Sequence, residues 1–348
     1  MVEDAKASLA RRLPGGQKLY PNPLIQGGAI LPFPPFHPRA PWWGGDLQTL
    51  RNTLRYKPPA LEAGTRLILP LADGDALVGL LNMPEVDTGK PAIVAVHGLT
   101  GDENSRNIRT TAAYHLGQGF PVVRLNQRGA GPSLGFARGH YHAGRSEDLR
   151  QALPHLPAAI LARGLFLVGV SLGGNMLLKF MAEGGLPMVH AAVAVSAPID
   201  LKRAQATIMR PRNAIYHQHL LRAMKADALR AAHASPATIA GIDTIYDFDD
   251  RIVAPANGFA DAEDYYARCS AGPLLGQIRT PTLAIHAADD PWIPAGMYTA
   301  LDWPADRTVS LLMAPSGGHV GFHARDSRWP WHDRCTGLFF EACLATRT

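Results

Sequence analysis

Six short, continuous apolar runs alternate along the chain with longer segments of helical character. Such runs are typical of strands that are buried on both faces of a parallel sheet, and the longer segments are typical of the helices that connect them. The runs are Ala92 to Val96, Phe120 to Leu125, Leu165 to Val170, Ala191 to Ser196, Thr282 to His286 and Val309 to Met313. The pattern therefore predicts an α/β fold with helices on both faces of a mostly parallel sheet.

A hairpin is predicted at the start of this sheet. Two apolar-rich runs, Thr65 to Leu71 and Ala76 to Asn82, flank the turn sequence Ala72-Asp73-Gly74-Asp75. Asp-Gly between such runs favours a tight turn between antiparallel strands. With the six parallel runs, the hairpin gives a sheet of about eight strands. The predicted helices are Ile108 to Leu116, Ser146 to Leu161 and Gly173 to Glu183.

The chain divides into an arm, a main domain and an insertion. Residues 1 to about 60 are rich in proline and glycine, which favours an extended N-terminal arm over a helix. Residues 61–348 are expected to form the main domain. Between Ala197 and Pro281 the alternation is interrupted by a mostly helical stretch that includes His219 to Ala232. We expect residues from about 198 to 270 to form a helical cap.

The composition excludes several classes of protein. With 47% hydrophobic and 18% charged residues, the chain has the balance of a globular protein with a real core. The net charge is +5, but lysine and arginine are scattered with no block of five like charges, so neither a nucleic acid nor an anionic membrane is expected as a partner.

The cysteines and the N-terminus indicate the compartment. Cys269, Cys335 and Cys343 contain no C-x-x-C pair and cannot all form intramolecular disulfides, which favours a reducing compartment and argues against a zinc knuckle. Val2, Glu3 and Asp4 open the chain without the basic and apolar regions of a signal peptide. We therefore expect a cytoplasmic protein without stable membrane insertion.

A G-x-S-x-G sequence follows one of the predicted strands. Leu165 to Val170 leads directly into Ser171-Leu172-Gly173, and a predicted helix comes next. Small residues around a serine let the backbone bend sharply between strand and helix, which exposes the hydroxyl above the sheet edge. The alternative is a purely structural tight turn. The strand and helix on either side favour Ser171 as a nucleophile.

Serine needs a base, and the base needs an orienting acid. His319 follows the last predicted strand after Gly317 and Gly318, which allow a loop to bring the ring over the sheet edge. Asp289 and Asp290 follow the strand before it, and we favour Asp290 as the acid, with Asp289 bonding the loop backbone. Asp200, after an earlier strand, is a further candidate. The chain order Ser, Asp, His is that of α/β-hydrolases.

An acyl-transfer site also needs two backbone donors for the oxyanion, and each is worth on the order of 3 kcal/mol. The amide of Leu172, directly after the serine, should be one of them. The amide of Leu99 should be the other, because it lies in the loop His97-Gly98-Leu99-Thr100-Gly101 after a strand. His97 is expected to hold that loop, with a substrate contact as the alternative.

Several of these strings together resemble the YheT-like branch of α/β-hydrolases. They are His97 to Gly101, Asn126 to Gly131, Tyr141 to Gly144, Gly169 to Asn175, Asp289 to Pro291 and Gly317 to Phe322. Asp46 to Leu50 resembles an early His-x-Leu-Gln-Thr motif of that branch, with Gly45 where a histidine is expected. The resemblance covers about residues 40 to 340. It implies a carboxylic ester hydrolase, with relatives among esterases, monoacylglycerol-type lipases and phospholipases, and without a metal or an organic cofactor.

The expected substrate is a small-molecule ester with a short-to-medium acyl chain, or one similar to a monoacylglycerol. Two alternatives use the same fold: an acyltransferase with the same triad, and a binding protein without activity. A metal hydrolase built on His319 and His323 is a third alternative, although Val320, Gly321 and Phe322 between them supply no glutamate of an H-E-x-x-H site.

Overall fold

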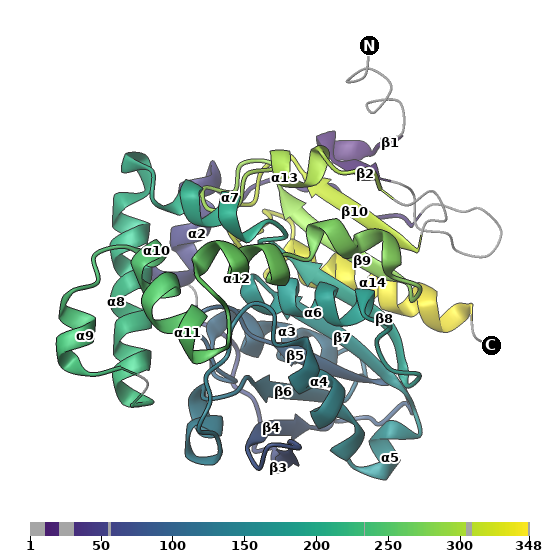
Figure 1. The fold of residues 1–348 in the computed structure, drawn as a ribbon. Helices are drawn as coiled ribbons and strands as arrows, with labels where there is room; N and C mark the ends of the chain where they lie inside the picture. The colour runs from purple at the N-terminus through teal and green to yellow at the C-terminus, as the bar shows by residue number, and fades with distance from the viewer. Residues whose placement is uncertain (1–10, 21–30, 55–56, 233, 304–307, 347–348) are drawn as a thin grey trace.

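A ten-stranded sheet forms the centre of the computed structural model, which describes residues 11–20, 31–54, 57–232, 234–303 and 308–346 (Figure 1). The strand order is β1-β2-β10-β9-β8-β7-β5-β6-β4-β3. The strands are β1 (Arg11–Arg12), β2 (Lys18–Tyr20), β3 (Thr65–Pro70), β4 (Ala76–Asn82), β5 (Ala92–Val96), β6 (Val122–Asn126), β7 (Leu165–Val170), β8 (Val189–Val195), β9 (Thr282–Ala287) and β10 (Val309–Ala314). Residues 1–10, in which no signal peptide is predicted, lie outside the described residues.

The six strands from β5 to β10 are the six predicted apolar runs, and they pair only in parallel with one another. The predicted hairpin β3–β4 joins them through antiparallel pairing of β4 with β6. The predicted α/β fold is confirmed, but the described residues form a sheet of ten strands instead of about eight. The two additional strands, β1 and β2, come from the arm and extend the sheet at β10, and the two and three residues described for them are too few to show a hydrophobic period.

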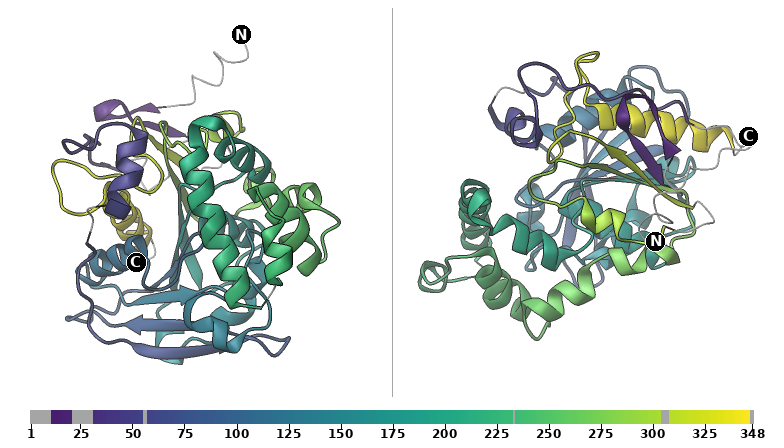
Figure 2. Two further views of the ribbon diagram at one scale, coloured as in Figure 1. Left: turned by 90° about the vertical axis from the view of Figure 1, so that its left-hand side faces the viewer. Right: turned by 90° about the horizontal axis from the view of Figure 1, so that it is seen from above.

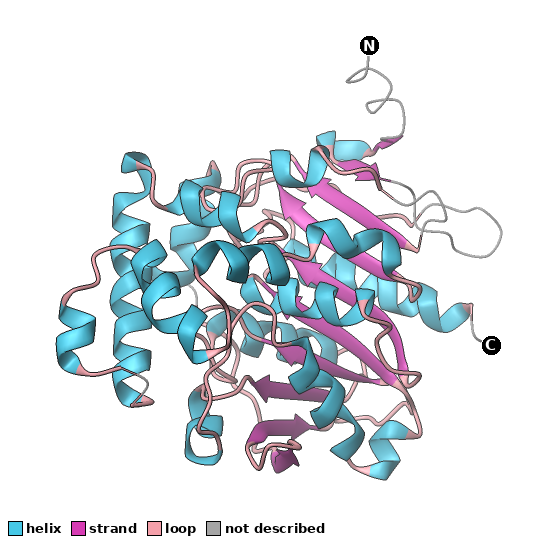
Figure 3. Cartoon of the chain, viewed as in Figure 1, coloured by secondary structure: helices cyan, strands magenta, loops and turns pink. Residues whose placement is uncertain are grey.

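Helices cover both faces of the sheet (Figure 3). On one face lie α3 (Arg106–Leu116) and α14 (Trp331–Ala345), and on the other lie α4 (Ser146–Ala152), α6 (Leu172–Ala182) and α13 (Gly296–Thr299). The single helix predicted over 146–161 is wrong. It is divided into α4, a 3-10 turn at Leu153–His155 and α5 (Ala158–Leu161), because Pro154 and Pro157 lack the amide hydrogens that a continuous helix needs.

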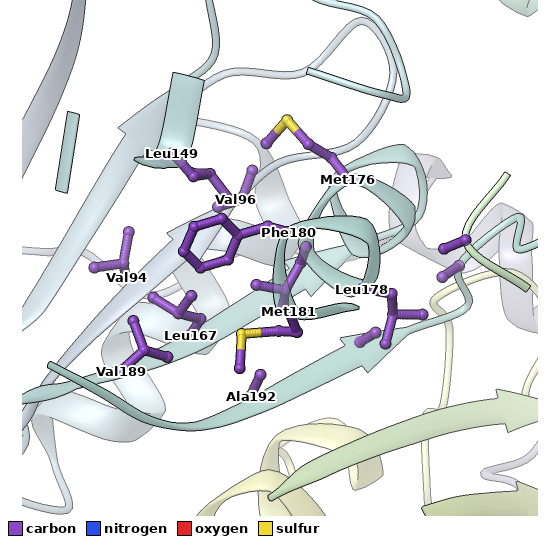
Figure 4. Packing of buried hydrophobic residues seen from close by; sticks show 14 of the residues in the cluster. Val94, Val96, Leu149, Leu167, Met176, Leu178, Phe180, Met181, Val189 and Ala192 are labelled. Atoms are coloured by element: carbon purple, nitrogen blue, oxygen red, sulfur yellow. The ribbon is translucent and has the colours of Figure 1, made fainter. Parts of the chain in front are cut away.

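Successive side chains of each parallel strand enter different halves of the core. In β5, Ala92, Val94 and Val96 pack on the α6 side, whereas Ile93 and Ala95 pack on the α14 side. This alternation follows from the two-residue repeat of a strand, and it explains why the runs are apolar throughout. Figure 4 shows Phe180 and Met181 of α6 against this sheet face.

The arm contains a helix as well as extended chain. Helix α2 (Gly45–Leu54) lies in the stretch predicted to be extended, between Pro41 and Pro58, where proline no longer prevents a helix. The boundaries of the arm and main domain remain predictions.

The described residues of 198–270, which we call the cap, are mostly helical and lie between β8 and β9 in the chain. They contain α7 (Leu201–Ile208), α8 (Ala214–Arg230), α9 (Pro236–Ala240), α10 (Ile245–Phe248), α11 (Ala254–Ala256) and α12 (Ala262–Cys269). Figure 2 shows α2 beside α8, and Tyr216 of α8 donates a hydrogen bond to Asp46 of α2 at 3.0 Å. In the described part of the chain, none of the helices combines the length and the apolar character needed to span a membrane.

Candidate active site

Ser171 lies at the sharp turn between β7 and α6. Its φ of 53° and ψ of −123° belong to a region that non-glycine residues rarely adopt, and such conformations are concentrated at functional sites. The turn depends on its small neighbours. A Cβ atom on Gly169 would lie 2.5 Å from the carbonyl oxygen of Gly173, and one on Gly173 would lie 2.3 Å from that of His97. The local sequence therefore permits a bend that larger residues would prevent.

Three of the predicted site residues form one hydrogen-bonded line. The Nε2 atom of His319 lies 2.9 Å from the Oγ atom of Ser171, and its Nδ1 atom lies 2.9 Å from Oδ2 of Asp290. The neutral tautomer that fits carries its proton on Nδ1, which donates to the carboxylate and leaves Nε2 free to accept from the serine hydroxyl. The structure thus brings together residues 171, 290 and 319 from three separate loops.

Asp290 is held as a carboxylate although it is buried. Burial favours its neutral form, but the charge of His319, the hydrogen bond from its ring and the amide of Ile293 outweigh burial and hold the pKa of Asp290 below its ordinary value. Oδ1 accepts hydrogen bonds from the amides of Trp292 at 2.8 Å and Ile293 at 3.0 Å. Both carboxylate oxygens therefore have donors, which fixes the orientation of the carboxylate.

The two other candidate acids have different partners. Asp289 accepts a hydrogen bond from the amide of Gly318 at 2.9 Å, in the loop that leads to His319. Asp200 accepts one from the amide of Arg203 at 3.0 Å and caps the N-terminus of α7. Asp289 therefore bonds the loop backbone, as expected, and Asp200 has a structural partner.

Leu99 and Leu172, the predicted oxyanion donors, follow β5 and open α6. Both line the same cavity as Ser171 and His319. The loop of Leu99 is held by the buried ring of His97, whose Nδ1 donates to the carbonyl of Gly98 at 2.8 Å and whose Nε2 accepts from the amide of Gln127 at 3.1 Å. Burial lowers the pKa of His97 to about 4, so the ring is neutral and holds the loop as predicted.

Two side chains next to His319 have no individual prediction from the sequence. Thr49 of α2 accepts a hydrogen bond from the amide of His319 at 2.8 Å. Trp292 stacks on the ring of His319, with 4.2 Å between the centroids and 26° between the planes. The string Asp46 to Leu50 gave a signal for Thr49, but only as part of a family resemblance. Nothing in the local sequence distinguished Trp292 from an ordinary core aromatic residue.

His319 and His323, the pair considered for a metal site, bind different groups. The ring of His323 bonds the side chains of Asn52 at 2.8 Å and Arg51 at 2.6 Å. Burial and the charge of Arg51 lower the pKa of His323 to about 2. Over the ranges that the structure describes, no group of three or more His, Cys, Asp or Glu side chains is arranged to hold a metal ion.

A cavity of about 810 Å³ opens above Ser171 and extends under the cap. Ligand sites in proteins usually measure about 300–1,000 Å³. Its cap wall is mostly apolar, although Gln205, His219 and Asp227 of the cap also line it, and polar side chains such as Asn104 and Asn107 line the side nearer α3. The apolar wall contains Leu201, Ile208, Leu220, Met224, Ile245 and Phe248.

Known proteins resemble the chain in sequence and in fold. The profile of the α/β hydrolase fold family matches residues 91–326. YheT of Escherichia coli strain K12 is 35% identical over 273 residues, which cover 73% of this chain and 77% of that protein. The monoacylglycerol lipase of Saccharomyces cerevisiae is 28% identical and is matched over 71% of this chain and 58% of its own length.

The solved structure of 2,6-dihydroxy-pseudo-oxynicotine hydrolase has the same fold. It superposes with a TM-score of 0.56 at 21% identity, and the match covers 86% of this chain and 72% of that one. The predicted fold and the resemblance noted in the sequence are both confirmed by these matches. With a family profile over most of its length and more than a third of its aligned residues shared with YheT, the chain belongs to the YheT-like branch of the α/β-hydrolase family.

Proposed function

We propose that the protein hydrolyses carboxylic esters with Ser171 as the nucleophile, His319 as the base and Asp290 as the orienting acid. The observation that carries this proposal is the hydrogen-bonded line from the Ser171 hydroxyl through His319 to Asp290, with both distances at 2.9 Å. A serine hydroxyl is a weak nucleophile until a base removes its proton, and this line supplies the base in contact.

In the first half of the reaction, Nε2 of His319 takes the proton of Ser171 while Oγ attacks the ester carbonyl carbon. The negative charge moves to the carbonyl oxygen, which the amides of Leu99 and Leu172 stabilise as the oxyanion hole. The protonated His319 then gives its proton to the alcohol oxygen, the carbon–oxygen bond breaks, and an acyl group remains on Ser171.

In the second half, water replaces the alcohol. His319 takes a proton from the water molecule, the hydroxide oxygen attacks the acyl carbon, and the carboxylic acid leaves as Ser171 regains its proton. Throughout, Asp290 keeps the ring in one tautomer and balances the positive charge that forms on it twice.

The cavity supports esters with a short-to-medium acyl chain, or esters similar to a monoacylglycerol. The apolar part of the cap wall suits an acyl chain, because burial of each methylene contributes about 0.8 kcal/mol. The polar side near α3 suits the alcohol part. A relative that is named as a monoacylglycerol lipase supports the same substrate class. The three cysteines have free thiols, which fits the proposed cytoplasmic location.

The experiment compares the wild type with Ser171→Ala and with Ser235→Ala, an exposed cap serine as the matched control. A fluorophosphonate label is located by mass spectrometry, and hydrolysis is measured with p-nitrophenyl esters from acetate to palmitate. We expect labelling and hydrolysis in the wild type and in Ser235→Ala, none in Ser171→Ala, and the highest kcat/KM between butyrate and octanoate.

Labelling that survives in Ser171→Ala would reject the proposed nucleophile, and a maximum at palmitate alone would reject the substrate class. No labelling and no turnover in the wild type would favour the inactive binding protein. Product analysis with added glycerol distinguishes the two active alternatives, because an acyltransferase would form a new ester faster than free acid.

A further inference from the structure

The indole ring of Trp292 covers one face of the His319 imidazole. The ring centroids are 4.2 Å apart and the planes are tilted by 26°. Because the nitrogen atoms of His319 already bond Ser171 and Asp290 along the ring edge, the face is the part of the ring that remains for packing. Trp292 occupies that part.

Trp292 belongs to the same short loop as Asp290. Its backbone amide donates to Oδ1 of Asp290 at 2.8 Å, while Tyr216 of the cap packs on the indole with 5.5 Å between centroids. The buried indole Nε1 atom has no hydrogen-bond partner among the described residues. Packing and stacking therefore hold the ring in place, because no hydrogen bond of the indole is available to do so.

We infer that Trp292 is a positioning residue for His319, which holds the imidazole in plane with Ser171 and stabilises the imidazolium through its π face. The inference rests on the proposed function, because the charged ring matters only where His319 takes a proton. Indole has the strongest cation–π attraction of the protein side chains, and it acts only when the ring is charged. It therefore stabilises the two steps in which His319 carries a proton.

The expected effect of Trp292 on the reaction rate is small compared with the effect of the triad residues. A cation–π contact corresponds to roughly 2- to 30-fold in rate, whereas loss of a triad acid costs about 10,000-fold. Loss of the Trp292 ring should therefore lower the rate without abolishing the reaction.

The pH dependence of activity can report on His319 only if its neighbours keep their charges. The titratable groups near it are Asp290 from the β9 loop, which bonds its ring, His286 from β9, which interacts with it electrostatically, and, beyond Trp292, Tyr216 from α8. Burial lowers the pKa of His286 to about 4, and burial together with Asp46 raises the pKa of Tyr216. Since the pKa of Asp290 is also lowered, none of the three changes charge near neutral pH.

Two substitutions distinguish electrostatic stabilisation from simple filling of space. Trp292→Leu keeps an apolar side chain but removes the π face, and Trp292→Phe keeps a smaller π face and removes the unpartnered N–H. We expect Trp292→Leu to lower kcat for p-nitrophenyl butyrate by about 10-fold with KM changed less than about 2-fold. We also expect the acid limb of its kcat/KM profile to move by about 0.5 pH unit to lower pH, because the protonated ring loses its partner.

Trp292→Phe should be intermediate in kcat, and its melting temperature should equal or exceed that of the wild type, because a buried donor without a partner is destabilising. Trp329→Phe is the matched control, since Trp329 packs on Tyr114 and does not line the cavity. It should leave kcat and the acid limb unchanged.

Tryptophan emission gives a readout that does not need turnover. Protonated imidazole quenches the fluorescence of an indole in contact with it. The emission of Trp292, measured as the difference between the wild type and Trp292→Phe, should therefore decrease on acidification at the pH of the acid limb. The same titration in Ser171→Ala tests the stack even if no ester is hydrolysed. An unmoved acid limb in Trp292→Leu, or emission from Trp292 that does not titrate, would overturn the inference. Absent turnover with a normal titration would instead count against the proposed function.

Discussion

The hydroxyl oxygen of Thr49 accepts a hydrogen bond from the backbone amide of His319 at 2.8 Å, although the two residues are 270 positions apart. The same hydroxyl donates to the carbonyl of Gly45 at 2.7 Å, and Asn52 donates to the carbonyl of Val320 at 2.9 Å. Helix α2 of the arm therefore holds the loop that carries the base. The arm is a structural part of the site and not only a connection to it.

Removal of the Thr49 hydroxyl should disturb this loop. Thr49→Val has nearly the same shape but leaves the amide of His319 without an acceptor, at a cost of about 1–3 kcal/mol. We expect kcat/KM to fall by roughly 10-fold, with a lower melting temperature. Thr49→Ser keeps the acceptor and should stay within about 2-fold of the wild type in steady-state ester hydrolysis. Equal activity of the valine and serine variants would show that the hydrogen bond does not position His319.

The two neighbouring aspartates should differ sharply in their effect on the rate. Asp290→Asn presents an amide to Nδ1 and disfavours the tautomer that accepts from Ser171, so kcat should fall by about 10,000-fold. Asn at position 289 can still accept from the amide of Gly318, and Asp289→Asn should therefore lower kcat by less than about 3-fold. Single-turnover measurements with p-nitrophenyl butyrate compare the two, and the reverse ranking would make Asp289 the acid.

A structural feature can be predicted from this sequence only when its signal lies within a short stretch of the chain. The strands β5 and β7 were predicted with their observed bounds, because burial on both faces leaves a continuous apolar run. Ser171 lies in a motif whose meaning depends only on the strand before it and the helix after it.

Contacts between distant segments gave no such signal. Thr49, on a helix of the arm, bonds the backbone amide of His319, and Trp292, on a loop after β9, stacks on its ring. No sequence period or motif predicts that these segments meet at one histidine. The choice between Asp289 and Asp290 likewise depends on how the loop turns after β9. Only two residues of β1 and three of β2 belong to the described part of the chain, which is too few to show alternation.

Gly98 should be required for the reaction more than for folding. A Cβ atom there would lie 3.0 Å from Cβ of Ser171 and 3.6 Å from its Oγ, next to the predicted donor Leu99. Gly98→Ala should therefore lower kcat/KM by about 100-fold, since a small displacement at the reacting atoms is costly. Gly135→Ala is the control, because no atom lies within 4 Å of a Cβ there. The hypothesis fails if both variants keep full activity, or if Gly98→Ala does not fold by circular dichroism.

The stability of the protein should depend on pH through Asp333, which is buried at the start of α14. Its Oδ1 accepts from the hydroxyl of Thr111 at 2.7 Å, while Oδ2 has no hydrogen-bond partner among the described residues. Burial outweighs the hydrogen bond from Thr111 and raises the pKa of Asp333 from 3.8 to about 7. The side chain is therefore protonated in the folded protein at pH values where the unfolded chain has already released the proton.

Between these two pKa values the folded state binds more protons, so a rise in pH favours unfolding. The stabilising contribution of protonated Asp333 is complete below pH 3.8 and is lost by about pH 7. Asp333→Asn keeps the acceptor for Thr111 but cannot ionise. It should match the wild type at pH 4 and exceed it at pH 8, by on the order of 4 kcal/mol in the free energy of unfolding.

The quantity to measure is the difference in free energy of unfolding between Asp333→Asn and the wild type, because other buried groups oppose the loss of stability with rising pH. Burial lowers the pKa of His115 and of His332 to about 3, so both favour unfolding in acid, in the variant as in the wild type. Urea unfolding at pH 4, 6 and 8 gives the difference, with Asp326→Asn as the control for an exposed carboxylate that pairs with Arg334 at 2.9 Å. A gain from Asp333→Asn that is the same at all three pH values would mean that ionisation of Asp333 is not its cause.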